Sequence, residues 1–108
     1  MRSATDSVTE VVLSGRLDLD GVQAVQDRFT FAIAPRGVPA LVDLAGVEFL
    51  ASLGIGMFVS VAHALKAHKA PLVLFGARPM VHKTLTAAGV HNVLVLAGTR
   101  DEAMQRLA

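Results

Sequence analysis

Cysteine, tryptophan and tyrosine are all absent from this sequence of 108 residues. Without cysteine the chain cannot form a disulfide, use a thiolate nucleophile or bind zinc through thiolates. Small extracellular domains often depend on disulfides, so their absence favours a reducing compartment, and we expect a cytoplasmic protein. Because Trp and Tyr are missing too, stacking of nucleic acid bases on aromatic side chains is not an expected mode of binding.

An excess of charge of either sign and a long hydrophobic run are also missing. Ten Lys and Arg against nine Asp and Glu give a formal net charge of +1, and the basic residues are scattered. No basic stripe of the kind that binds nucleic acid or anionic lipid is present. Residues 1–10 lack the apolar segment of a secretion signal, and the longest apolar run, residues 53–65, is shorter than the ~20 residues of a membrane span. We expect no nucleic acid partner and no membrane insertion.

Hydrophobic residues are abundant, at 53% of the chain with a mean hydropathy of +0.53. This length is enough for one domain with one core, so we expect a single domain over residues 1–108. Apolar surface that remains after such a core is filled usually marks a binding site for a partner.

Runs rich in apolar and β-branched residues alternate with helical patterns along the chain. Strands are expected at residues 8–13, 40–44, 72–75 and 93–96, with a short edge strand at residues 2–4. Helices are expected after Asp20 as N-cap, over residues 53–68, from Pro79 to about Ala88, and after residue 99. This order predicts an α/β fold with a mixed four- to five-stranded sheet and about four helices mainly on one face.

Residues that could carry catalysis or bind a cofactor do not form a recognisable pattern. His63 and His68 are five residues apart and do not share a helix face, while His82 and His91 lack carboxylates at ligand spacing. No Gly-x-Ser-x-Gly motif is present, and the glycines at 54 and 56 lack the Lys of a phosphate-binding loop. We expect surface histidines, no metal, no cofactor and no enzymatic activity.

Ser52 is the most informative residue, because it precedes the helical segment 53–68. On its own it is best explained as an N-cap, as is the acidic pair Asp18 and Asp20 before the preceding helix. The helix at 53–68 adds a second observation. If Ile55, Phe58, Val59, Ala62 and Leu65 face the core, the outward face consists of Leu53, Met57, Ser60 and Ala64, which are apolar or small. Ser52 would then border an exposed apolar patch suited to a protein partner.

Three segments of the chain resemble the STAS family, whose members include the bacterial anti-sigma factor antagonists. LSGRLD (residues 13–18) is similar to the Gly-x-Leu-Asp segment of that family. LVDLAGVEFLASLGIG (residues 41–56) is similar to its most specific block, in which a strand and Asp-Leu precede Asp-Ser-Ser/Thr-Gly-Leu-Gly. From Leu72 onward the order of strand, helix, Gly-Val, strand and helix is similar too.

The resemblance implies an anti-sigma factor antagonist that regulates transcription by binding an anti-sigma serine kinase. It also implies that phosphorylation of Ser52 blocks binding and that a serine phosphatase restores it. The residues expected at the partner surface lie around this serine and the matching acidic segment: Asp18, Asp20, Ala51, Ser52, Leu53, Gly54, Ile55 and Met57.

Two positions depart from the family block, since Ala51 replaces its Asp and Leu53 replaces its second Ser/Thr. These departures leave partner binding intact as an expectation, and they leave open either a divergent kinase or a domain that is no longer switched. The alternative function is a STAS adaptor subunit of a transporter ATPase or of a stress-signalling complex. A third class, binding of a nucleotide or small ligand, is disfavoured because the candidate face is mostly apolar.

Overall fold

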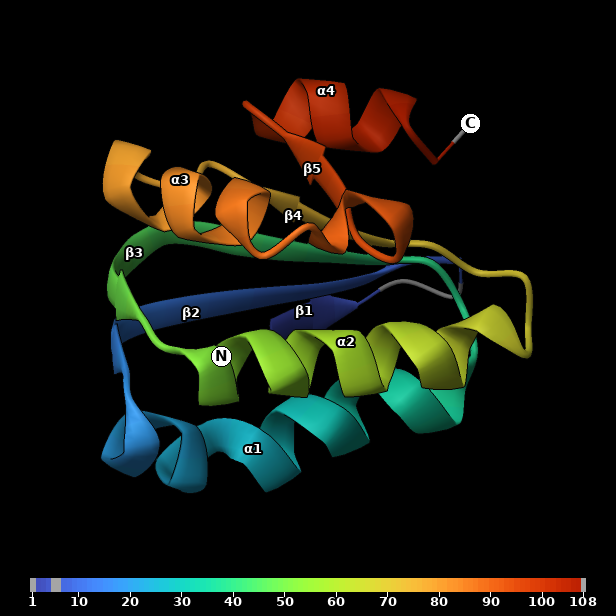
Figure 1. Cartoon of the computed structure of the whole chain (residues 1–108). Helices are drawn as coiled ribbons and strands as arrows, with labels where there is room; N and C mark the ends of the chain where they lie inside the picture. The colour runs from blue at the N-terminus through green and yellow to red at the C-terminus, as the bar shows by residue number, and fades with distance from the viewer. Residues whose placement is uncertain (1, 5–6, 108) are drawn as a thin grey trace.

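A single five-stranded sheet organises the computed structural model, which describes residues 2–4 and 7–107. The strands follow one another across the sheet in chain order, and only the first is antiparallel to its neighbour (Figure 1). They are β1 (Arg2–Ala4), β2 (Thr9–Leu17), β3 (Ala40–Leu50), β4 (Leu72–Phe75) and β5 (Val95–Ala97). The helices are α1 (Leu19–Ile33), α2 (Ser52–Lys66), α3 (Pro79–Ala87) and α4 (Arg100–Gln105), with short 3-10 turns η1 (Ala34–Arg36) and η2 (Val90–Asn92).

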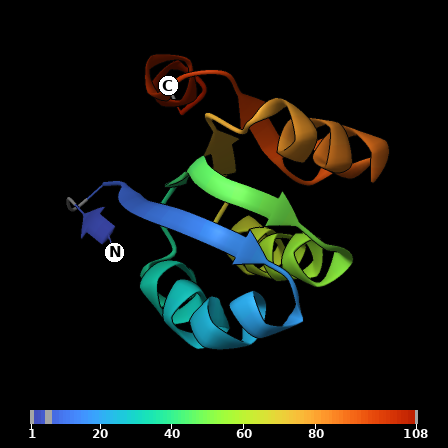
Figure 2. The same ribbon diagram turned by 90° about the vertical axis from the view of Figure 1, so that its left-hand side faces the viewer.

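The helices cover the two faces of the sheet unequally. The larger hydrophobic core joins buried residues of α1, α2 and α3 to inward-facing residues of β2, β3 and β4. The smaller core places Ala103 of α4 against Leu41, Val73 and Phe75 on the other face. Two views at right angles show α4 apart from α1 and α2, with the strands between them (Figures 1 and 2). The prediction of a mixed sheet with four helices mainly on one face is confirmed.

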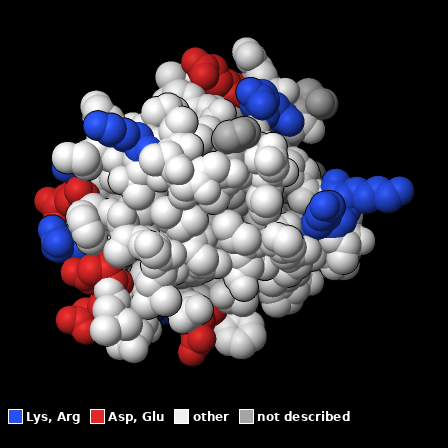
Figure 3. Space-filling model, in the orientation of Figure 1, with Lys and Arg blue, Asp and Glu red and all other residues white. Residues whose placement is uncertain are grey.

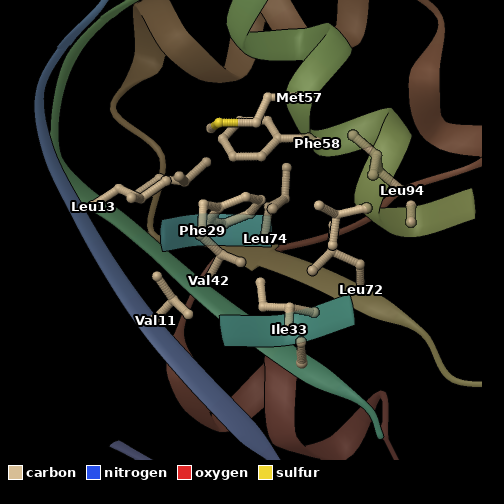
Figure 4. Close-up of a cluster of buried hydrophobic side chains, with 14 of the residues drawn as sticks. Val11, Leu13, Phe29, Ile33, Val42, Met57, Phe58, Leu72, Leu74 and Leu94 are labelled. Atoms are coloured by element: carbon tan, nitrogen blue, oxygen red, sulfur yellow. The ribbon is translucent and has the colours of Figure 1, made fainter. Parts of the chain in front are cut away.

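The larger core is centred on Phe29 of α1 and Phe58 of α2 (Figure 4). Their rings meet edge to face, with centroids 5.6 Å apart and an interplanar angle of 67°. Such aromatic pairs contribute about 0.5–1.5 kcal/mol beyond the burial of their area. The pair therefore ties α1 to α2, and the first turns of these two helices form the candidate site.

Two strands are longer than the sequence pattern predicts, and both extend toward the candidate site. β2 continues past Ser14 and Gly15 to Leu17, with shifts in its register against β3 on either side of Ser14. Gly15 has a φ of +81°, a conformation that glycine adopts at little cost, so this residue bends the strand instead of ending it. β3 continues from Leu44 to Leu50 beside it. None of the described helices is long and apolar enough to cross a membrane.

Candidate partner-binding site

The parallel pairing of β2 and β3 brings the starts of α1 and α2 to one edge of the sheet. Leu17 and Leu50 are partners at the ends of the two strands, and a helix begins within two residues of each. The backbone N–H of Ala51 donates to the carbonyl of Leu17 at 3.0 Å, which fixes the junction before α2 to the end of β2. The segments around Asp18 and Ser52, 34 positions apart in the sequence, therefore lie side by side at the left of Figure 1.

Gly54 allows this close approach, because a side chain there would meet the ends of β2 and β3. An added Cβ would lie 2.6 Å from Cδ1 of Leu50 and 3.3 Å from Cβ of Leu17. Gly56, two residues later, has no neighbouring atom within 4 Å of the same added Cβ. The glycine at 54 therefore has a packing role, whereas the glycine at 56 leaves the outward surface of α2 bare.

Ser52 is the first residue of α2 and is exposed, as expected, but it is not the N-cap. The cap is Ala51, whose φ of −98° and ψ of 170° are those of a capping residue, and it makes no side-chain cap hydrogen bond. The expectation that Ser52 caps the helix is wrong by one position, because the Ala51–Leu17 backbone bond sets where the helix begins. The Ser52 hydroxyl thus stands at the helix N-terminus without serving as its cap.

Asp18, not Asp20, caps α1, so the expectation for Asp20 is wrong. The Asp18 carboxylate accepts from the N–H of Gly21 at 3.0 Å and lies 3.4 Å from Nε of Arg16. The hydrogen bond from Gly21 has the largest effect on the pKa of Asp18, and together with the nearby Arg16 guanidinium it outweighs the opposing effect of desolvation, so this pKa lies below its usual value. Asp20 is exposed in the first turn of α1, where its charge suits the helix dipole.

Arg16, Leu19 and Phe49 complete this edge, and none of the three is among the residues predicted for the partner surface. The Arg16 guanidinium stacks over the Phe49 ring, 4.4 Å from its centroid, and these two residues are partners in the β2–β3 register. Phe49 is 36% exposed and Leu19 is 58% exposed, so both present apolar surface near the junction of β3 and α2, where Ser52 lies. The signal that could have found Phe49 is the apolar pattern continuing beyond Leu44, where the predicted strand ended.

The outward face of α2 is the one predicted, apart from one residue. Leu53 is 47% exposed, and Ser60 and Ala64 are exposed as expected. Met57 was expected on this face, and that is wrong: its side chain is only 2% exposed and lies beside Phe58 (Figure 4). Gly54 must face β2, and this requirement turns the helix so that Met57 is buried while Ile55 and Val59, assigned to the core, are only half-buried.

The outward surface of α2 carries no Asp, Glu, Lys or Arg before Lys66. Exposed helix faces normally carry charged residues. In the space-filling view, the face formed by α2 and α3 is uncharged across its centre, and the charged side chains lie around its rim (Figure 3). An uncharged face of this kind, bordered by the exposed side chains of Leu53 and Phe49, is typical of a surface that binds another protein.

The rim next to Ser52 is more acidic than basic. Residues 16–20 and 48–53 contain the carboxylates of Asp18, Asp20 and Glu48 and one cation, Arg16. This Arg16 is already engaged with Asp18 and Phe49. Within the described residues no group of three or more His, Asp or Glu could hold a metal ion.

Comparison with known proteins places this geometry in a family. The family model described as "Mlab, STAS domain" matches residues 1–97. A protein named anti-sigma-B factor antagonist from Listeria monocytogenes is 22% identical over 98 residues, which cover 91% of this chain and 85% of that protein.

Solved structures agree with the fold. An anti-sigma factor antagonist from Thermotoga maritima superposes with a TM-score of 0.88 at 15% identity, covering 99% of this chain and 92% of that one. The antagonist SpoIIAA has been solved without and with phosphorylation. The unphosphorylated form gives a TM-score of 0.79 at 23% identity, covering 98% of this chain and 93% of that one. The phosphorylated Bacillus form gives 0.71 at 22% identity, covering 100% and 98%.

Proposed function

The chain belongs to the STAS domain family, and on that premise we propose that it is an anti-sigma factor antagonist. It would bind an anti-sigma factor and so release the sigma factor that the latter holds, with no catalytic activity of its own. Such a regulator works in the cytoplasm, where transcription takes place. Relatives with this name, in sequence and in structure, support the proposal.

The uncharged face of α2 is the observation that carries this proposal. Leu53 is close to half exposed, and Leu19 and Phe49 extend the apolar surface across the first turns of α1 and α2. A partner that covered this surface would remove apolar area from water, and polar groups at the rim would set its orientation. Met57 lies beneath this surface in the core and would support it without touching the partner.

Ser52 is the proposed switch of this interface. Its hydroxyl is exposed at the start of α2, where a serine kinase could reach it, and the kinase would be the anti-sigma factor itself. A phosphate adds about −1.5 to −2 charges at pH 7. The adjacent rim already holds three carboxylates and one occupied guanidinium, so the new charge would lack a free cation in those segments.

This added charge would oppose binding, because an unpaired charge buried in an interface costs several kcal/mol. Each 1.4 kcal/mol is about tenfold in affinity, so phosphorylation would lower affinity by roughly 100-fold or more. A serine phosphatase would restore the binding form. Ala51 and Leu53, which replace the family's Asp and second hydroxyl, would leave Ser52 as the sole acceptor in this block.

The switch is tested by titrating wild type, Ser52→Ala and Ser52→Glu against the purified anti-sigma factor of the same bacterium. We expect Ser52→Ala to bind as wild type and Ser52→Glu to bind at least about tenfold more weakly. Mass spectrometry of the protein from its own cells should find phosphate on Ser52. Equal affinities for all three forms, with no phosphate found, would mean that docking occurs without this switch.

A second candidate function is that of an adaptor subunit of a transporter ATPase. Two observations favour it: the matching family model carries the description "Mlab, STAS domain", and the Asp that precedes the family's serine is Ala51 here. The same uncharged face of α2 would serve this role. Capture of partners on the immobilised chain from its own cells, followed by mass spectrometry, separates the two functions. An anti-sigma factor supports the first, and an ATPase subunit supports the second.

A further inference from the structure

A cavity of about 320 Å³ lies at the opposite end of α2 from Ser52. Its walls come from the last turns of α2, the segment before β4 and the segment between η2 and β5. Its lining includes Ala70 and Leu72, which are buried, and Val93, which is 39% exposed. The volume is at the lower end of the range of pockets that bind small ligands.

The charged groups around this cavity are all positive. Lys66 and Lys69 line it together with His63 and Asn92, and its described lining includes no carboxylate. In the space-filling view, blue side chains project at the right-hand end, where α2 finishes (Figure 3). The cavity thus combines apolar walls with two lysine residues, a composition that complements an anion with an apolar body.

Lys69 has a backbone conformation that ordinarily favours glycine. Its φ is +56°, and it is the one described residue other than glycine with a positive φ. The N–H of Ala70 donates to the carbonyl of Leu65, and the N–H of Lys69 to that of Lys66, the pattern that closes a helix through a left-handed residue.

The same chain uses glycine at its other comparable helix ends. Gly37 after η1 has a φ of +62°, and Gly89 after α3 has a φ of +69°. A lysine at the third such position raises the conformational energy of the folded chain, because its Cβ crowds the backbone there. Backbone strain of this kind is typical of residues retained for function, and the side chain of Lys69 lines the cavity.

We propose that this cavity binds a small phosphate monoester with a short apolar body. The ammonium groups of Lys66 and Lys69 hold the phosphate, whose charge of about −1.5 to −2 at pH 7 matches two cations. Lysine ammonium groups are compact charges that suit a phosphate, and Asn92 adds a neutral hydrogen-bonding group. The apolar body lies against Leu72 and Val93. This site is separate from the Ser52 edge, so it stands whether or not the chain binds an anti-sigma factor.

The test is an NMR titration of the ¹⁵N-labelled chain with hexyl phosphate, hexanol and inorganic phosphate. Hexyl phosphate should shift the amide signals of residues 62–70, 72 and 92–95, and it should bind about tenfold more tightly than either of the other two. If hexanol or inorganic phosphate binds as well as hexyl phosphate, or if the shifts lie elsewhere, the proposal is overturned.

A Lys69→Gly variant separates binding from folding. Glycine relieves the left-handed backbone, so this variant should melt at a higher temperature than wild type and yet bind hexyl phosphate about fivefold more weakly. Lys83→Ala removes a lysine from the exposed surface of α3 and should leave the affinity unchanged. Unchanged binding by Lys69→Gly, or a lower melting temperature, would contradict the argument.

Discussion

Gly54 and Gly56 form a matched pair of positions that tests how the candidate site is built. Both lie in the first turns of α2, so replacement by Ala brings each a similar gain of about 1 kcal/mol in helix propensity. Only Gly54→Ala adds a steric cost, because its Cβ would lie 2.6 Å from Leu50 and 3.3 Å from Leu17, whereas the space at Gly56 is empty. Overpacking of this kind costs about 1–3 kcal/mol.

The difference between the two variants therefore isolates the contact of α2 with the ends of β2 and β3. We expect Gly56→Ala to be more stable than wild type by about 1 kcal/mol, and Gly54→Ala to be about 1–3 kcal/mol less stable than Gly56→Ala. In a domain of this size each 1 kcal/mol shifts Tm by about 4–8 °C, so thermal and urea unfolding followed by circular dichroism resolve the difference. If both variants are stabilised equally, Gly54 does not allow α2 to pack closely on the ends of β2 and β3, and the geometry of the Ser52 edge is wrong.

Two further predictions concern the caps of the same two helices. Ala51→Asp should raise the free energy of unfolding by about 1 kcal/mol, because Ala51 has capping geometry without a side-chain acceptor, and urea unfolding measures this; no gain would mean that the N-terminal amides of α2 are already satisfied. Asp18→Asn keeps a capping side chain but removes the charge. Since the pKa of Asp18 is lowered on folding, its ionised form stabilises the protein above about pH 3.8, and this contribution fades as the pH falls through the lowered pKa. Wild type should exceed the variant in stability at pH 6 and lose that advantage as the pH falls through the lowered pKa of Asp18.

Much of the fold could be predicted because local pattern and tertiary structure agree. The run at Leu72–Phe75 is buried on both faces of the sheet and was predicted with the bounds that the structure shows. Pro79 and Gly89 mark the two ends of α3 as expected. The helix following residue 99 begins at a Thr99 cap that accepts from the N–H of Glu102.

The site was harder to predict because tertiary contacts decide its details. The sequence predicts Ser52 as the N-cap of α2, whereas the cap in the structure is Ala51, one position earlier. The choice depends on the hydrogen bond from the Ala51 N–H to the carbonyl of Leu17, which is far away in the sequence. Met57 fits either face of α2 by periodicity, and the contact of Gly54 with β2 sets the rotation that buries it. Phe49 lies at the site because β3 pairs with β2 and places it beside Arg16. Such a pairing between distant segments leaves no signal in the local sequence pattern.

Leu53 offers the most direct test of the claim that the α2 face binds an anti-sigma factor. Leu53→Asp removes the apolar contact of a half-exposed leucine, about 1 kcal/mol, and adds an unpaired charge that costs several kcal/mol in an interface. Asp in the first turn of a helix suits its dipole, so the fold should be retained. Met104→Asp is the control, because Met104 is 39% exposed on α4, across the sheet from α2.

The measurement is the calorimetric titration of the purified anti-sigma factor with wild type, Leu53→Asp and Met104→Asp. We expect wild type and Met104→Asp to bind alike and Leu53→Asp to bind at least about 100-fold more weakly. Undiminished binding by a folded Leu53→Asp, or loss of binding by Met104→Asp alone, would contradict the assignment of the α2 face as the docking surface.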